Sequence, residues 1–141
     1  MPFELGRLAP DGAAAFFQQT EREALKTFYA FSVIWHEQSY DIAATDGGAI
    51  VGATRIRVAA SLAHVERIVV LPGRRREGIG RALLADAADL ANYYNCHKMT
   101  TLVPHRSDAQ RFFEACGYKE EAVLPQHTFK LDEAILRLFL L

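Results

Sequence analysis

The chain has 141 residues, of which half are hydrophobic and 23% are charged, a composition typical of one globular domain. Its 16 basic and 17 acidic residues give a formal net charge of -1, which argues against a nucleic-acid protein held by overall charge. We therefore expect a single domain over residues 1–141, with any anionic partner bound locally.

Cysteine usage and hydropathy indicate the compartment. Cys96 and Cys116 form no Cys-x-x-Cys spacing, and no basic stretch followed by an apolar segment begins the chain. The apolar run 134–141 is interrupted by Arg137 and is far shorter than the roughly 20 residues that span a bilayer. We expect a cytoplasmic protein with no membrane segment, no nucleic-acid partner and no metal site.

The first third of the chain predicts one strand and two helices. Residues 3–8 alternate apolar and polar side chains, as a short strand does, and a Pro-Asp-Gly turn signal follows. Residues 13–35 have helical spacing, and Thr20-Glu21-Arg22-Glu23 resembles a capping box that starts a second helix. One face of that second helix is predicted to enter the core: Ala24, Leu25, Phe28, Phe31, Ser32 and Trp35.

The middle of the chain predicts a hairpin and a further strand. Residues 40–45 and 49–58 flank Asp46-Gly47-Gly48, a strong turn signal between two strand-like runs. Residues 63–71 form the next predicted strand. These three strands are expected to be antiparallel neighbours.

The remaining elements alternate between helices and strands. A helix is predicted over 79–94, a strand over 98–103, a short helix between the capping box Ser107–Gln110 and the Gly117 terminator, and strands over 119–124 and 134–140. Several antiparallel strands and one strand-helix-strand crossover indicate an α+β (mixed α/β) fold.

The stretch Val69–Arg81 joins a strand to a helix through three arginines and two glycines. Free N–H groups at a helix start, the helix dipole and adjacent guanidinium groups favour a phosphate or pyrophosphate. The stretch has neither the Gly-Lys-Ser/Thr of a Walker loop nor the dinucleotide-binding Gly-x-Gly-x-x-Gly. The alternative is that Gly78 and Gly80 only permit close packing of the helix on the strand.

Two motifs in this order resemble the signatures of the GNAT superfamily of N-acetyltransferases. Arg75-Arg76-Glu77-Gly78-Ile79-Gly80 fits Arg/Gln-x-x-Gly-x-Gly/Ala, and Ala109-x-x-Phe112-Phe113-x-x-x-Gly117-Tyr118 is similar to Ala-x-x-Phe-Tyr-x-x-x-Gly-Phe. The order of predicted elements, β-α-α-β-β-β-α-β-α-β-β, also fits. The resemblance implies a central, mostly antiparallel twisted sheet of six to seven strands with about four helices.

The resemblance implies acetyl-CoA as a co-substrate. Its pyrophosphate would contact the backbone amides of Arg75, Arg76, Glu77, Gly78, Ile79, Gly80 and Arg81, and its pantetheine arm and thioester would contact main-chain groups of Ile68, Val69 and Val70. A strand N–H aimed at the thioester oxygen would stabilise the developing oxyanion. An unprotonated primary amine, of a small molecule or of a protein, would then attack the thioester directly.

Such an attack needs a base for the ammonium group. Glu66 is the first candidate, because it lies on the strand leading to the loop, where several family members have a base or a substrate-binding carboxylate. The alternative is an ion pair between Glu66 and Arg55 or Arg57. His64 and His127 are further candidates, although a lone histidine is more often structural.

The departing thiolate needs an acid, and here the chain differs from the family pattern. Phe113 occupies the position of the usual tyrosine, and Arg106 that of a frequent asparagine. Water or another group must then supply the proton: Tyr118, which we take as the catalytic candidate, or Tyr94 or Cys116. Two functions remain open, an N-acetyltransferase and an acyl-CoA-binding module with little or no turnover.

The acceptor is the least defined part of the prediction. In the family the first two helices and the final strands form the acceptor cleft, and here their charges are mixed with a modest acidic bias. This bias suits a cationic amine, or it is a solvated face. The apolar C-terminal stretch 134–141 is explained by burial in its own sheet or by a homodimer interface.

Overall fold

The computed structural model describes residues 2–29, 31, 33 and 35–140. The chain divides into two compact units, Met1–Trp35 and His36–Leu141. Among the described residues, no helix has both the length and the apolar character needed to cross a bilayer. The elements are α1 (Ala14–Phe28), β1 (Gln38–Asp46), β2 (Ala49–Ala59), β3 (Leu62–Val70), η1 (Pro72–Arg74), α2 (Ile79–Tyr93), β4 (Lys98–Pro104), α3 (Asp108–Ala115), β5 (Lys119–Leu124), η2 (Thr128–Lys130) and β6 (Glu133–Phe139).

Among its described residues, the first unit contains one helix, α1, where the sequence predicted two. The predicted restart at Thr20 is wrong because the Thr20 hydroxyl donates to the carbonyl of Phe16 at 2.6 Å, so it bonds the preceding turn instead of capping a new one. The helix ends before Tyr29, whose backbone is extended (φ -103°, ψ 143°). Ser32 of the predicted apolar face lies outside the described residues.

The predicted first strand is also absent. Residues 3–8 have no regular secondary structure, and the described sheet contains no strand before β1. A strand must pair to satisfy its backbone groups, and six alternating residues followed by a turn do not supply a partner.

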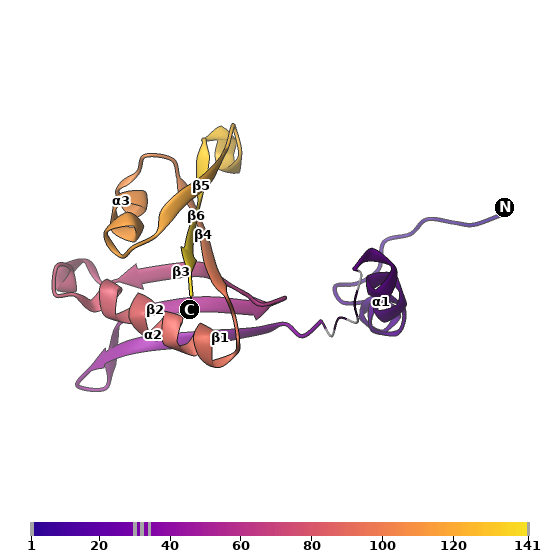
Figure 1. The fold of residues 1–141 in the computed structure, drawn as a ribbon, viewed down its shortest axis with the longest axis horizontal. Helices are drawn as coiled ribbons and strands as arrows, with labels where there is room; N and C mark the ends of the chain where they lie inside the picture. The colour runs from indigo at the N-terminus through magenta and orange to yellow at the C-terminus, as the bar shows by residue number, and fades with distance from the viewer. Residues whose placement is uncertain (1, 30, 32, 34, 141) are drawn as a thin grey trace. The chain divides into compact units, whose positions relative to one another are not determined.

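The second unit is built on one six-stranded sheet in the order β1-β2-β3-β4-β6-β5. Only β3 and β4 are parallel within this sheet, and its other neighbours are antiparallel. Figure 1 shows β4, β6 and β5 turning away from the three strands β1–β3. The predicted fold class is confirmed: a mixed α+β fold with a mostly antiparallel sheet.

Local turn chemistry explains most of the element boundaries. Gly47 and Gly48, with φ of 58° and 84°, form the two-residue turn between β1 and β2, as the sequence predicted. Ser107 caps α3 by accepting from the N–H of Gln110 at 3.2 Å. At the other end Gly117 (φ 97°) and Tyr118 donate to the carbonyls of Glu114 and Phe113, which is a Schellman motif.

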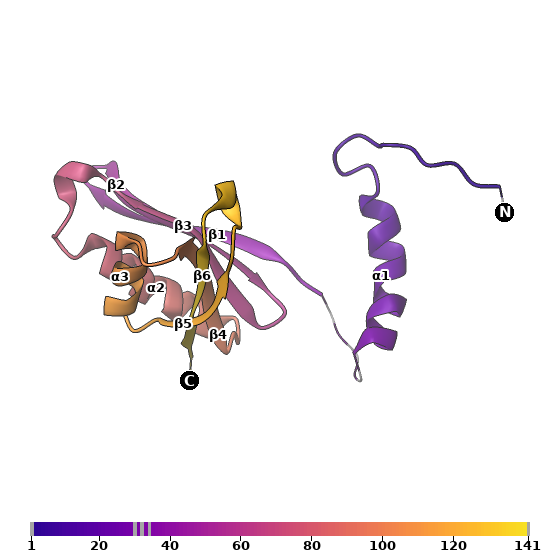
Figure 2. The same ribbon diagram turned by 90° about the horizontal axis from the view of Figure 1, so that it is seen from above.

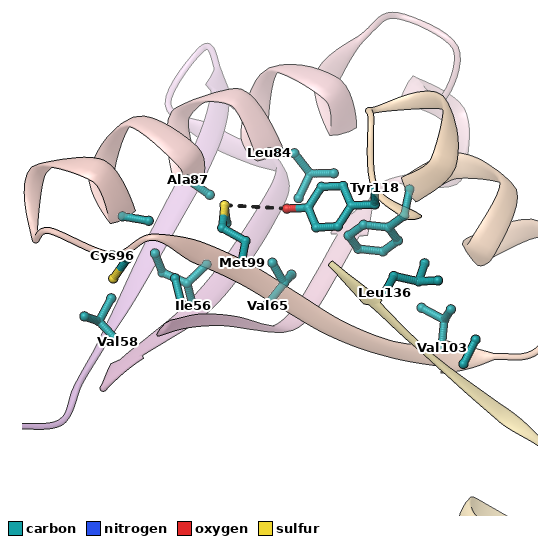
Figure 3. Close-up of a cluster of buried hydrophobic side chains, with 14 residues drawn as sticks. Ile56, Val58, Val65, Leu84, Ala87, Cys96, Met99, Val103, Tyr118 and Leu136 are labelled. Carbon is teal, nitrogen blue, oxygen red and sulfur yellow. Dashed lines mark hydrogen bonds between the residues drawn. The ribbon is translucent and has the colours of Figure 1, made fainter. Parts of the chain in front are cut away.

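The core lies between the sheet and the two helices α2 and α3, which pack on the same face (Figure 2). Tyr118, the residue before β5, and Met99 of β4 meet in this core, where the Tyr118 hydroxyl donates to the Met99 sulfur at 3.6 Å (Figure 3). The largest fully buried side chains all come from strands: Ile56, Met99, Leu136, Val65 and Thr54.

A β-bulge in β3 divides the sheet. Along β2 and β3, Arg55 is opposite Arg67 and Ile56 is opposite Val65, so Glu66 is the extra residue. The parallel pairing of β3 with β4 covers four pairs and ends at Val65, immediately before the bulge. Beyond this point β3 pairs only with β2.

Two buried threonines fix the main chain on either side of the bulge. The Thr101 hydroxyl donates to the Val65 carbonyl at 3.1 Å, and the Thr54 hydroxyl donates to the Arg67 carbonyl at 2.9 Å. Both threonines are 3% exposed or less. Each hydroxyl therefore satisfies a carbonyl at the point where the sheet ladder is interrupted.

Replacing Thr101 with valine keeps the shape of the side chain but leaves the Val65 carbonyl without this donor. We expect Thr101→Val to lower the free energy of unfolding by about 1–3 kcal/mol, the cost of an unsatisfied buried polar group. Urea denaturation measures this change in the free energy of unfolding. The control Thr45→Val, at an exposed position of β1, should stay within about 0.5 kcal/mol. Equal stability of both variants would contradict the role given to Thr101.

Candidate functional site

The free edge of β3 presents main-chain donors. Leu71 donates its N–H to Val51 of β2 at 2.9 Å. Because N–H directions alternate along a strand, the N–H groups of Val70 and Ile68 point away from β2. The β3–β4 pairing has already ended at Val65, so these two groups face the side where the strands separate. Of the three residues predicted for the thioester arm, Ile68 and Val70 thus supply donors, whereas the N–H of Val69 points toward β2.

The loop after β3 leads into the N-terminus of α2 with two left-handed residues. Arg76 has φ 66° and Gly78, the N-cap, has φ 84°. The first bond at the start of the helix is donated by Ala82 to the Gly78 carbonyl at 3.0 Å. The N–H groups of Ile79, Gly80 and Arg81 therefore have no partner inside the helix and lie at its positive end.

The three consecutive arginines have different partners. Arg74 binds Glu77 through two hydrogen bonds of 2.8 and 3.0 Å and binds Asp46 of the β1–β2 turn at 2.8 Å. The bond from Arg74 lowers the pKa of Glu77. Arg75 donates to the carbonyl of Val70 at 3.4 Å. In the described part of the chain, Arg75 and Arg76 pair with no carboxylate, so their charges remain available to an anion.

Close packing places the start of α2 against the sheet and α3. A Cβ atom on Gly80 would lie 2.9 Å from Cζ of Phe112, and one on Gly52 of β2 would lie 2.9 Å from Cγ2 of Ile79. A Cβ on Gly78 would meet nothing within 4 Å. The two glycines of the loop differ: Gly80 permits helix packing, and Gly78 permits a left-handed turn over open space.

Glu66 lies in a cluster of charges on the sheet face opposite α2. Arg57 donates to Glu66 at 2.9 Å, and its Nε lies 3.2 Å from Glu37. The ion pair expected as the alternative role of Glu66 is therefore present, and its role as a base stays a prediction. His64 contacts the Thr100 hydroxyl at 2.9 Å, and burial lowers the pKa of His64.

Tyr118 and Phe113, the residue at the usual acid position, are both buried in the core. Phe113 is 3% exposed and contacts Tyr118 edge to face at 5.0 Å. Tyr118 is 2% exposed and its hydroxyl is bonded to Met99, and burial raises its pKa above the usual range. Its burial in the core favours a structural role over proton donation.

The other polar candidates are also placed by the structure. Tyr94 stacks on Tyr40 at 4.9 Å near the end of α2. Burial raises the pKa of the half-buried Cys116 thiol, which makes it a poor nucleophile. His127 precedes η2 in the β5–β6 loop and donates its N–H to the Leu131 carbonyl. Within the described part of the chain, no hydrogen bond joins any of these three residues to the loop before α2.

Three residues that position the site were missing from the sequence analysis: Gly52, Thr54 and Thr101. Threonine is common in strands, and nothing in the sequence marks which hydroxyl bonds to a bulge. A glycine within a strand, however, often signals close approach of another element. Gly52, within β2, is such a glycine, and the structure shows that Ile79 of α2 packs against it.

Comparison with known proteins identifies the family. The family model described as an acetyltransferase (GNAT) domain matches residues 4–127. The chain therefore belongs to the GNAT acetyltransferases, as the two motifs predicted. No curated protein matches the chain.

Solved structures share its fold. An acetyltransferase from Bacillus cereus superposes with a TM-score of 0.78 at 16% identity, over 99% of this chain and 98% of that one. The ribosomal-protein-S18-alanine N-acetyltransferase from Escherichia coli gives 0.66 at 19% identity, over 96% and 92%. The PaiA N-acetyltransferase from Thermoplasma acidophilum in complex with coenzyme A gives 0.62 at 17% identity, over 72% and 60%.

The contact between Gly80 and Phe112 gives a double-mutant test. Gly80→Ala should destabilise the protein by about 1–3 kcal/mol through overpacking, and Phe112→Leu in the same chain should recover part of that loss. Gly78→Ala should be destabilising through its backbone alone, so Phe112→Leu should add to it without recovery. Thermal unfolding of the wild type and the five variants measures both cycles. Additive effects for Gly80 and Phe112 would show that the two residues do not interact.

Proposed function

We propose that the protein is an N-acetyltransferase that moves the acetyl group of acetyl-CoA to a primary amine by direct attack. The observation that supports it most is the combination of free N–H groups at the α2 N-terminus with the unpaired edge of β3. The first fits a pyrophosphate, and the second fits an amide-bearing arm and a thioester carbonyl.

The donor would lie along the end of β3 and the loop that follows it. Its pyrophosphate would accept from the N–H groups of Arg75–Arg81 and pair with the guanidinium groups of Arg75 and Arg76. Its thioester oxygen would accept from the N–H of Ile68 or Val70, where negative charge develops during attack. Bound acetyl-CoA supplies an activated acyl carbon, and the protein supplies position and charge stabilisation.

The transfer needs one base and one acid. The ammonium form of the acceptor loses a proton to Glu66 or to water, its nitrogen forms a bond with the acyl carbon, and the carbon–sulfur bond breaks. The nitrogen, still positively charged after the attack, loses its second proton to water, and the thiolate takes up a proton, which gives the neutral amide and free CoA. Since Phe113 has no hydroxyl and that of Tyr118 is bonded to Met99, we propose water as the proton donor.

A second function has one observation in its favour. Phe113 is buried where the family has a tyrosine, so the donor site lacks the usual acid. An acyl-CoA-binding module would keep the loop and need no acid. CoA binding in calorimetry, with no amine-dependent thiol release over a broad panel of amines, would establish the module and exclude the enzyme.

Arg75 and Arg76 should bind the donor through its phosphates. We expect the double variant Arg75→Gln/Arg76→Gln to weaken CoA binding about 10²- to 10⁴-fold, since hydrogen bonds to charged groups contribute about 1.5–3 kcal/mol each and two guanidinium groups are removed. Binding of pantetheine, which has no pyrophosphate, should not change. The control is Arg111→Gln on α3. Equal losses for CoA and pantetheine in calorimetry would contradict the phosphate assignment.

Glu66 should matter most when the acceptor is protonated. We expect Glu66→Gln to lower the rate about 10²-fold below the pKa of the amine, where a general base is needed, and much less above it. The control is Glu37→Gln, which removes the other carboxylate near Arg57. Parallel pH-rate profiles of the wild type and Glu66→Gln would exclude Glu66 as the base.

A further inference from the structure

The bulge turns two consecutive side chains toward the same face of the sheet. In a regular strand Glu66 and Arg67 would point to opposite faces. Here Glu66 bonds to Arg57, and Arg67 is opposite Arg55 in the ladder. Both partners alternate with buried residues of β2 and so project from the face opposite α2. Glu66 and Arg67 therefore form an adjacent pair of opposite charges.

Charge pairing on this face leaves Arg67 available. Arg55 binds Asp41 through two hydrogen bonds of 2.6 and 2.9 Å. Arg57 lies between two carboxylates, those of Glu66 and Glu37. Within the described ranges, Arg67 forms an ion pair with no carboxylate, and it is exposed. The cluster thus contains one unpaired guanidinium, that of Arg67. It lies beside Glu66, whose partner Arg57 also binds Glu37.

The pair lies next to the residues proposed to hold the donor. Arg67 directly precedes Ile68, whose N–H faces the side where β3 and β4 separate. With a rise of about 3.3 Å per residue, Ile68 is about 3 Å from Arg67 and about 7 Å from Glu66 along the strand, whereas Val70 is about 10 to 13 Å from the two residues. A molecule bound by Glu66 and Arg67 would therefore have its reactive group near a thioester held at Ile68.

We propose that the acceptor is a small amine with a carboxylate close to the reacting nitrogen, an α-amino acid being the simplest case. Its ammonium group would face Glu66, and its carboxylate would accept two parallel hydrogen bonds from the Arg67 fork. Arg67 is thus a specificity-determining residue. This inference rests on the proposed function, because it assigns the second substrate of the same site.

The test compares L-leucine with isoamylamine, its decarboxylated analogue, and with leucinamide, in which the carboxylate is neutralised. Thiol release from acetyl-CoA gives kcat/KM for each amine. We expect L-leucine to exceed both analogues by at least about tenfold, through the charge-assisted bonds to Arg67.

Variants assign the preference to Arg67. Arg67→Gln should lower kcat/KM for L-leucine about 10- to 100-fold, mainly through KM, and leave isoamylamine within about twofold. Arg67→Lys should be intermediate, since an ammonium group cannot form the planar fork. The control Lys119→Gln removes an exposed charge of β5 and should change neither amine.

Calorimetry separates this inference from the proposed function. CoA titrated into the protein tests the donor site alone, and L-leucine titrated into the CoA-bound protein tests the acceptor site without turnover. If CoA binds and isoamylamine is acetylated as well as L-leucine, the inference is overturned and the proposed function stands. Turnover with a lysine-containing peptide, but not with L-leucine, also overturns it. If CoA does not bind, the proposed function itself fails.

Discussion

The hydroxyls of Thr54 and Thr101 hold the main chain of β3 on either side of Glu66. They come from the two neighbouring strands and satisfy carbonyls that a continuous ladder would have paired. The parallel pairing with β4 ends at the bulge between them, which leaves the N–H groups of the last residues of β3 without a neighbouring strand on that side. The bulge also turns the side chains of Glu66 and Arg67 to the same face of the sheet. The strand edge proposed for the donor and the charged pair proposed for the acceptor both derive from this one irregularity.

The parts of the fold that the sequence predicted are those set by local chemistry. The Gly47-Gly48 turn, the Ser107 cap and the Gly117 terminator each depend on residues within four positions. The arginine-glycine loop was likewise recognisable, because a strand, a left-handed glycine and a helix start follow one another in the chain. Such features need no knowledge of distant neighbours.

Most of the parts that were missed or wrong depend on partners far along the chain. Residues 3–8 alternate correctly but have no strand to pair with. Thr20 can cap a helix or bond to the turn before it, and the sequence does not decide between them. The burial of Tyr118 depends on Met99, 19 residues away, and the bulge depends on two threonines from different strands. Tertiary contacts decided every case except that of Thr20, whose bond to Phe16 is local.

The four-residue pairing of β3 with β4 has a consequence for folding. It has fewer register pairs than any other junction of the described sheet, and it joins residues 36 positions apart. The meander β1–β3 closes through tight turns, whereas this junction must first order the whole of α2, at a larger loop-closure entropy. We expect it to form late and to open at a lower free energy than the strands on either side. The strand edge proposed for the donor is then also the boundary between two cooperative folding units.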